Sequence, residues 1–309
     1  MSMTRTRLLF ATFAATSLLS ACGGGGGDAG GPGPTVSLAS ASNVKYSELM
    51  LITLSGANLD QPITLSSAAC RDFARSTAAP NVSTATTAYF TCRISGGVGN
   101  QTVNVAANGA TLSTVAYTVP VPQVSIVLSN GAGVAGTLVI TLSPTEAPVT
   151  VDNFLAYVKR GFYNGLTFHR HGRFANSSTF VLQAGGFAAP LTSGAAFPPA
   201  KAASAPIALE AGRGLSNLRY SLAMARLNLQ SSATSEFFIN TVDNVFLDTS
   251  GGGYAVFGRV TTGQALVDAM VAAPCNLSPL NFNPQPPNPA STDCLPEPNL
   301  VINGALQTQ

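Results

Sequence analysis

Short segments in which apolar and polar residues alternate constrain the fold of this chain more than any other feature. Alternation with a period of two places every second side chain on one face of a β-strand. Over the first third of the chain such segments are separated by turns of glycine, asparagine and serine, a spacing typical of an all-β sandwich. They are Thr35 to Leu38, Leu49 to Leu54, Ala88 to Ile94, Gln101 to Ala106 and Thr114 to Val119.

The composition favours β-rich domains outside the cytosol and excludes several classes of function. The length suggests about two domains, and only 9% of the 309 residues are charged, with a formal net charge of +2. So little positive charge provides no field that could hold a nucleic acid. The two histidines of the chain are His169 and His171, which excludes most histidine-based catalysis. A serine hydrolase is also excluded, because no G-x-S-x-G motif occurs.

The first 22 residues have the layout of a signal peptide that ends in a lipidation site. Arg5 and Arg7 precede an apolar stretch from Leu8 to Leu19, which is too short to span a bilayer. The sequence Leu-Ser-Ala-Cys at 19–22 resembles the lipobox of bacterial lipoproteins, in which the cysteine is acylated and becomes the first residue. The resemblance implies removal of residues 1–21 and a membrane anchor on Cys22. The alternative is a plain secretory signal with a chance cysteine.

Residues 22–34 carry the lipidated cysteine and a glycine-rich tether that has no apolar surface to bury. In lipoproteins of bacteria with two membranes, an aspartate directly after the cysteine commonly signals retention in the inner membrane. This chain has Gly23 there. We therefore expect a lipid-anchored protein of the cell envelope, held at the outer membrane and facing the periplasm.

Four further cysteines, an even number in an oxidising compartment, allow three disulfide pairings. Pairing between cysteines that are near in sequence is favoured. A Cys70–Cys92 bond would close a loop in the first domain, and a Cys275–Cys294 bond would cross-link the Pro/Asn-rich C-terminal segment. No metal site is expected, since the chain contains no C-x-x-C pair and no third ligand is evident near the two histidines.

Residues 35–120 form a predicted β-sandwich in which nothing is typical of catalysis. The segment LITLSGANL at 51–59, with the paired cysteines behind it, resembles the immunoglobulin-like domains called IPT/TIG that occur in cell-surface proteins. The resemblance implies an Ig-like domain that acts as a spacer or, alternatively, binds another protein. Pro120 and Pro122 then stiffen a short hinge, because each proline fixes its own φ and removes a donor.

After this hinge the pattern indicates several strands and two helices. The runs Val124 to Leu128 and Thr137 to Leu142 are joined by a glycine-rich turn and predict a hairpin. Pro148 suits the first turn of a helix whose apolar residues at 151, 154, 155 and 158 line one face. A second helix is predicted from Gln264 to Ala272. Many strands with two helices favour a barrel with end caps or an α+β sandwich.

Five sequence blocks in the second half follow the order, and nearly the spacing, of a known family. They are GFYNGLTFHRH at 161–171, FVLQAGGF at 180–187, NLRYSLAMAR at 217–226, SSATSEFFINT at 231–241, and FLD with YAVFGRV at 246–248 and 254–260. Together they resemble the cyclophilin family of peptidyl-prolyl cis-trans isomerases, especially its secreted bacterial members. The resemblance implies an isomerase domain at 121–273 and a Pro/Asn-rich C-terminal extension at 274–309. The predicted fold class is therefore all-β in two domains, an Ig-like β-sandwich followed by an eight-stranded antiparallel barrel capped by two helices.

The reaction implied by this resemblance needs neither nucleophile, metal nor cofactor. The barrier to X-Pro rotation, about 18–20 kcal/mol, comes from lost amide resonance. A catalyst needs an apolar pocket for the proline ring and a donor that favours the twisted nitrogen over the planar one. The resemblance assigns this donor to Arg170, which stays protonated when desolvated. It implies a substrate-binding set of Phe180, Val181, Gln183, Ala225, Phe238, Phe246, Leu247 and Tyr254, joined by Glu236 in place of the family's usual glutamine.

Two departures from the family pattern lie beside Arg170. The nine residues HGRFANSST separate Arg170 from Phe180, where members usually have a shorter loop, so the insertion tilts the arginine or covers the pocket. At position 236 a carboxylate is expected within reach of the arginine, which it orients or sequesters.

The sequence predicts a monomeric isomerase that accelerates X-Pro rotation in exported proteins and assists their folding in the cell envelope. Its predicted substrates are proline-containing polypeptides, and no nucleic acid is involved. The alternative is a binding module or chaperone that holds proline-containing segments without useful turnover. A third possibility places the function in the Ig-like domain, as adhesion or envelope binding.

Overall fold

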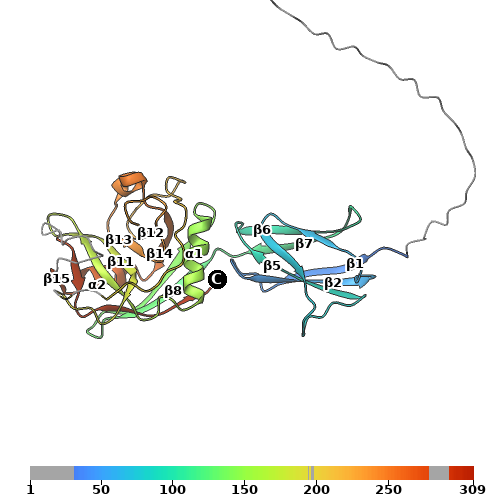
Figure 1. Ribbon diagram of the computed structural model, residues 1–309, viewed down its shortest axis with the longest axis horizontal. Helices are drawn as coiled ribbons and strands as arrows, with labels where there is room; N and C mark the ends of the chain where they lie inside the picture. The colour runs from blue at the N-terminus through green and yellow to red at the C-terminus, as the bar shows by residue number, and fades with distance from the viewer. Residues whose placement is uncertain (1–30, 194, 196–197, 278–291) are drawn as a thin grey trace, which may run out of the picture. The chain divides into compact units, whose positions relative to one another are not determined.

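The computed structural model describes residues 31–193, 195, 198–277 and 292–309 (Figure 1). Residues 34–309 belong to one folded unit. The predicted signal peptide, Cys22 and most of the tether lie outside the described residues. Within the described chain, no helix has both the length and the apolar character needed to cross a membrane.

The first domain consists of two antiparallel sheets whose strands show the predicted alternation of burial. A four-stranded sheet has the order β1-β2-β5-β4, and a three-stranded sheet has the order β3-β6-β7. The bounds are β1 (Thr35–Ser42), β2 (Leu49–Ala57), β3 (Thr64–Ser66), β4 (Cys70–Arg75), β5 (Thr87–Ile94), β6 (Gly99–Ala107) and β7 (Ala110–Val119). The five predicted strands are present, and the predicted disulfide between Cys70 and Cys92 is formed and joins β4 to β5.

Eight of the described strands close into an antiparallel barrel, which confirms the predicted barrel (Figure 1). The ring runs in the order β11-β13-β12-β14-β9-β8-β17-β10, and β10 pairs back with β11. The bounds are β8 (Gln123–Ser129), β9 (Ala135–Leu142), β10 (Leu166–Arg173), β11 (Thr179–Ala188), β12 (Ser221–Met224), β13 (Phe237–Asn240), β14 (Val256–Thr262) and β17 (Leu300–Gln307). Closure gives every strand of the ring a partner on both sides.

The C-terminal segment is part of the barrel, which differs from the predicted boundary at residue 273. Strand β17 pairs with β8 along its length and with β10 at two positions. The short strands β15 (Cys275–Leu277) and β16 (Cys294–Pro296) pair with each other, carry the predicted Cys275–Cys294 disulfide, and place Cys294 opposite His171 of β10. Strand β17 was not predicted, because it follows a Pro/Asn-rich stretch and because sequence patterns do not show which distant strand closes a barrel.

The two predicted helices are present and each buries one apolar face. Helix α1 (Pro148–Lys159) has its proline in the first turn, and the four predicted apolar positions at 151, 154, 155 and 158 are buried. Helix α2 (Gln264–Ala272) buries Val267 and Met270. A cluster of aromatic rings from the helix and the strands forms the barrel core, with Phe237 lying 5.5 Å from both Phe154 and Tyr163 between ring centroids.

Candidate active site on the outer face of the barrel

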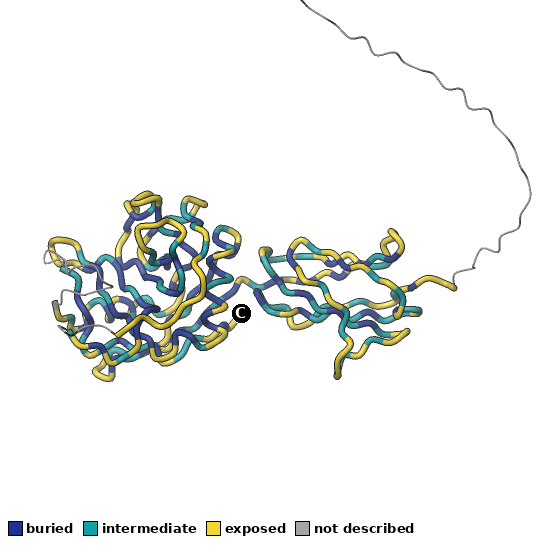
Figure 2. The backbone as a smooth tube through the Cα atoms, viewed as in Figure 1, coloured by how far each residue is buried: buried dark blue, intermediate teal, exposed yellow. Residues whose placement is uncertain are grey.

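A second apolar cluster lies on the face of the sheet opposite to the barrel core. Along β13, Phe237 and Ile239 belong to the main core, whereas Phe238 between them belongs to a separate cluster. Strands β12 and β13 are buried along their whole length, because both of their faces are covered (Figure 2). We call this the outer cluster; it comprises Val181, Ala223, Phe238, Leu247 and Val256, with the partly buried Phe180, Leu215, Ala225 and Tyr254 packed against it.

The outer cluster brings together most of the apolar residues that the sequence nominated for the pocket. Six of them belong to it: Phe180, Val181, Ala225, Phe238, Leu247 and Tyr254. The Phe246 ring lies 6.1 Å from that of Phe180 between centroids, and half of Phe246 is exposed at the edge of the cluster. An apolar surface that remains open to solvent at its edge suits the binding of a small apolar ring.

A β-bulge turns Arg170 toward this outer face. In a regular strand Arg170 would share a face with Phe168, two residues earlier, which is buried in the main core. The pairing of β10 with β11 shifts register between these residues, since Phe168 lies opposite Ala184 and Arg170 opposite Gln183. The extra residue, His169, therefore re-aims the arginine. Its guanidinium and the side chain of Val181 both lie against Gly172, where an added Cβ would come within 3.3 Å of Arg170 Cζ and 2.6 Å of Val181 Cγ2.

Hydrogen bonds hold the guanidinium of Arg170 from two sides. Its Nη1 donates to Gln183 Oε1 at 2.8 Å, and its Nε donates to Asp293 Oδ2 at 2.7 Å. Gln183 in turn donates from Nε2 to Glu236 Oε2 at 2.7 Å, and His169 Nε2 lies 3.4 Å from the same oxygen. Burial acts to raise the pKa of Glu236, but these contacts and the charge of Arg170 hold it below its ordinary value.

The carboxylate that pairs with Arg170 is not the one expected from the sequence. Glu236 reaches the arginine only through Gln183, whereas Asp293 binds it directly. Asp293 was not predicted, because it lies 123 residues after Arg170 in the sequence, in a segment that carries no recognisable motif.

The insertion after Arg170 lengthens the β10–β11 hairpin and adds an aromatic ring to the cluster edge. Strand β10 continues to Arg173, and Phe174 N donates to Ser178 O at 3.0 Å across the turn. The Phe174 ring stacks on Phe180 with centroids 4.7 Å apart and lies 6.2 Å from Phe246. The insertion was predicted from the sequence, but the packing of Phe174 against the cluster was not.

Buried amides position the short 3-10 helix η1 (Val245–Asp248), which carries Phe246 and Leu247. Asn244 Nδ2 donates to Phe180 O at 2.7 Å and to Asn240 Oδ1 at 2.8 Å. At the other end, Asn217 Nδ2 donates to Asp248 Oδ1 at 2.8 Å. Burial acts to raise the pKa of Asp248, but hydrogen bonds from Ser216 and Asn217 hold it below its ordinary value. These three asparagines were not among the predicted site residues.

His171 lies beside the second disulfide. Its ligand atoms and those of Cys275 and Cys294 all lie within 4.8 Å of one another. Both sulfur atoms are bonded to each other, so neither is available as the thiolate that a metal ion requires. Among the described residues neither ring nitrogen of His171 finds a hydrogen-bond partner. Burial lowers the pKa of His171 to about 4, so the imidazole is neutral at pH 7.

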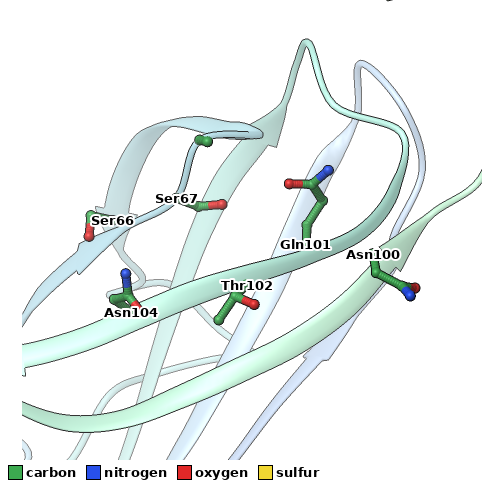
Figure 3. Close-up of a pocket in the computed structure, with 7 residues that line it drawn as sticks. Ser66, Ser67, Asn100, Gln101, Thr102 and Asn104 are labelled. Atoms are coloured by element: carbon green, nitrogen blue, oxygen red, sulfur yellow. The ribbon is translucent and has the colours of Figure 1, made fainter.

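The first domain carries a polar hollow along β3 and β6 (Figure 3). Hydroxyl and amide side chains line it, from Ser66, Ser67, Asn100, Gln101, Thr102 and Asn104. The lining contains neither a charged nor an aromatic side chain, and it offers no group suited to prolyl isomerisation.

An arginine therefore lies beside a partly exposed apolar cluster on the outside of a closed eight-stranded barrel, an arrangement that could bind a small apolar ring and donate hydrogen bonds next to it. The family model described as "Cyclophilin type peptidyl-prolyl cis-trans isomerase/CLD" matches residues 125–286. The chain therefore belongs to the cyclophilin family and is a peptidyl-prolyl cis-trans isomerase.

Curated relatives agree with this assignment. The peptidyl-prolyl cis-trans isomerase cyp18 of Streptomyces antibioticus is 48% identical over 141 residues, which cover 44% of this chain and 78% of the relative. Peptidyl-prolyl cis-trans isomerase B of Escherichia coli is 44% identical over 138 residues, covering 43% and 77%. A solved cyclophilin-type isomerase of Cryptosporidium parvum, crystallised in the presence of the dipeptide Ala-Pro, aligns with 60% of this chain and 99% of its own, at 19% identity and a TM-score of 0.44.

Proposed function

We propose that Arg170 is the catalytic residue and that the outer cluster binds the proline ring of the substrate. The observation that carries this proposal is that Arg170 lies opposite Gln183 and in register with Phe238 of the outer cluster, with its guanidinium against Gly172. As the C–N bond twists, the prolyl nitrogen becomes pyramidal and accepts a hydrogen bond that the planar amide does not accept. A donor held beside it stabilises the transition state more than the ground state, and so accelerates rotation.

The other nominated residues have roles that follow from their positions. Gln183 orients Arg170 and is close enough to the same site to bind the substrate backbone. Ala225 lies at the border of the outer cluster, where an extended proline-containing polypeptide would run, and Phe246 and Tyr254 form its rim. Glu236 acts on the substrate only through Gln183.

Exchange spectroscopy by NMR on a short Ala-Pro peptide tests this assignment. Residues 34–309 should accelerate cis-trans exchange, and Arg170→Ala should lower the catalysed rate at least a hundredfold, about 2.7 kcal/mol. Glu236→Gln should stay within about threefold of the wild type, since glutamine still accepts a hydrogen bond from Gln183. Full activity in Arg170→Ala would overturn the catalytic assignment. Acceleration only after Glu236→Gln would show that this carboxylate sequesters the arginine.

A second candidate is a module that binds proline-containing segments without useful turnover. The direct pairing of Arg170 with Asp293 favours it, because a carboxylate at 2.7 Å competes for the guanidinium. The same experiment separates the two functions: the wild-type chain that binds the peptide yet leaves its exchange rate unchanged is a binding module.

We also propose that the enzyme is an anchored lipoprotein of the cell envelope that assists folding of exported proteins. The lipobox-like sequence before Cys22 and two disulfides, which persist in oxidising compartments, support this location. Gly23 favours the outer membrane, and the N-terminal domain, proposed to be Ig-like, acts as the spacer. In a bacterium with two membranes, Cys22→Ser should move the protein from the membrane fraction to the soluble periplasmic fraction. Unchanged membrane association would contradict the anchor.

A further inference from the structure

The carboxylate of Asp293 makes two contacts beside the proposed catalytic arginine. Its Oδ2 accepts a hydrogen bond from Arg170 Nε at 2.7 Å, and its Oδ1 accepts one from the backbone N–H of Arg173 at 2.9 Å. The side chains of the pair are only partly exposed, 24% for Arg170 and 16% for Asp293. Asp293 lies beyond residue 286, where the match to the family model ends.

We propose that Asp293 is a positioning residue for Arg170, and this inference rests on the proposed catalytic role of that arginine. A guanidinium has five N–H donors in one plane. Asp293 holds the Nε edge while Gln183 holds Nη1, which fixes the plane from two sides. These bonds use two donors, and among the described residues the remaining N–H groups have no hydrogen-bond partner that would compete with the substrate.

The Cys275–Cys294 disulfide holds this carboxylate in place. Cys294 follows Asp293 directly, lies opposite His171 in the pairing of β16 with β10, and is cross-linked to Cys275 of β15. On the other side, Thr292 Oγ1 donates to Phe174 O at 2.9 Å in the hairpin insertion. Asp293 is therefore held on both sides, and the insertion and the C-terminal segment meet at the arginine.

Positioning matters because a free arginine side chain samples many rotamers and loses conformational entropy when it is fixed. A charge-assisted hydrogen bond to a carboxylate offsets this loss before the substrate arrives. Removing the carboxylate should therefore lower the fraction of time in which the donors face the prolyl nitrogen. Such a loss affects the transition state more than ground-state binding, and so lowers kcat with little change in KM.

Steady-state NMR exchange on the Ala-Pro peptide, with residues 34–309, tests this role. Asp293→Ala should lower kcat about tenfold with KM within twofold of the wild type. Asp293→Asn should be intermediate, since its single carboxamide oxygen can replace only one of the two acceptors. Asp268→Ala is the matched control, because it removes another Asp–Arg pair of the barrel, in which Arg219 Nη2 lies 2.9 Å from Asp268 Oδ1. Its kcat should stay within twofold.

The disulfide is tested in the same assay by a double-mutant cycle. Replacing both Cys275 and Cys294 by serine should lower kcat by a similar factor, and adding Asp293→Ala to this background should lower it no further. A dithiol reductant, which is oxidised to its own disulfide as the two protein thiols form, should reproduce the effect in the wild type but not in Asp293→Ala.

The outcomes separate this inference from the catalytic assignment itself. Loss of activity in Arg170→Ala with wild-type kcat in Asp293→Ala overturns the role of Asp293 and leaves the proposed function intact. A higher kcat in Asp293→Ala also overturns it, since the carboxylate would then withhold the arginine. If Arg170→Ala retains activity, the proposed function fails first. Independence of the disulfide and Asp293 effects in the cycle overturns the role of the disulfide.

Discussion

Strand β13 carries two neighbouring phenylalanines, one on the face that packs into the barrel core and one on the face that carries the outer cluster. Phe237 belongs to the main core and is fully buried among Phe154, Tyr163 and Phe168. Phe238, the next residue, belongs to the outer cluster, where its ring lies 5.7 Å from that of Tyr254. One face is sealed inside a closed barrel and stabilises the fold, whereas the other is open at its edge and suits a ligand. The same residue type therefore stabilises the core on one face and, on the other, lines the proposed substrate site.

The largest expected effect is on stability and comes from the inner face. Phe237→Ala should lower the free energy of unfolding by about 3–5 kcal/mol, because it leaves a cavity among rings that cannot collapse into it. Chemical denaturation of residues 34–309 measures the change. A loss below 1 kcal/mol would contradict a sealed, close-packed interior.

Substitution of the neighbouring residue should affect catalysis instead. Phe238→Ala removes the base of the outer cluster and should lower kcat/KM about a hundredfold, roughly 2.7 kcal/mol. Its stability loss should be smaller than that of Phe237→Ala, since its neighbours Phe180 and Tyr254 are only partly buried and can move into the space. The two effects are compared by exchange kinetics and denaturation on the same samples. The comparison of the two faces fails if Phe238→Ala costs more stability than activity.

The buried imidazole of His171 should make stability depend on pH. Burial lowers its pKa in the folded state to about 4, against 6.5 in the unfolded chain, so the unfolded state binds more protons between these values. The free energy of unfolding is therefore highest above pH 6.5, and it should fall by about 2 kcal/mol when the pH is lowered to about 5. Denaturation of His171→Leu should lack this slope. Since the chain has two histidines, NMR titration of the imidazole resonances shows directly whether one stays neutral near pH 5.

The smallest effect is expected at the rim. Phe174→Ala removes the ring that stacks on Phe180 and should raise KM for peptides with an apolar residue near the proline by about threefold, roughly 0.65 kcal/mol, with kcat unchanged. Peptides with a polar residue at that position serve as the matched control. Equal changes for both peptides would show that the ring does not contact the substrate.

Much of the fold follows from local sequence patterns. Pro148 and the apolar positions behind it predict α1, and alternating or apolar runs predict five strands of the first domain and, in the second domain, β8 and β9. The short strands β3 and β4 were missed: β3 has only three residues, and the residues of β4 are mostly polar or partly exposed. Strand β17 was missed for a different reason. It occupies the place between β8 and β10 that barrel closure requires, and such long-range pairing leaves no local signal.

In the candidate site too, some features follow from local sequence patterns and others depend on long-range contacts. The blocks around Arg170, Phe180 and Phe238 nominate residues that the structure gathers on one face. The bulge at His169 that re-aims the arginine, and the carboxylate that holds it, depend on register and on a contact 123 residues apart. Sequence patterns nominate the groups of this site, but the positions of those groups depend on tertiary contacts.

Titration of methyl-labelled protein with an Ala-Pro peptide, followed by NMR chemical shifts, tests the central claim that the outer face is the substrate site. Methyl groups of the outer cluster, such as those of Val181, Ala223 and Leu247, should shift in a saturable way. Methyl groups of Leu182 and Leu222, which alternate with them in the main core, should move little. The account is contradicted if the inner methyl groups respond more strongly, or if the shifts fall in the N-terminal domain.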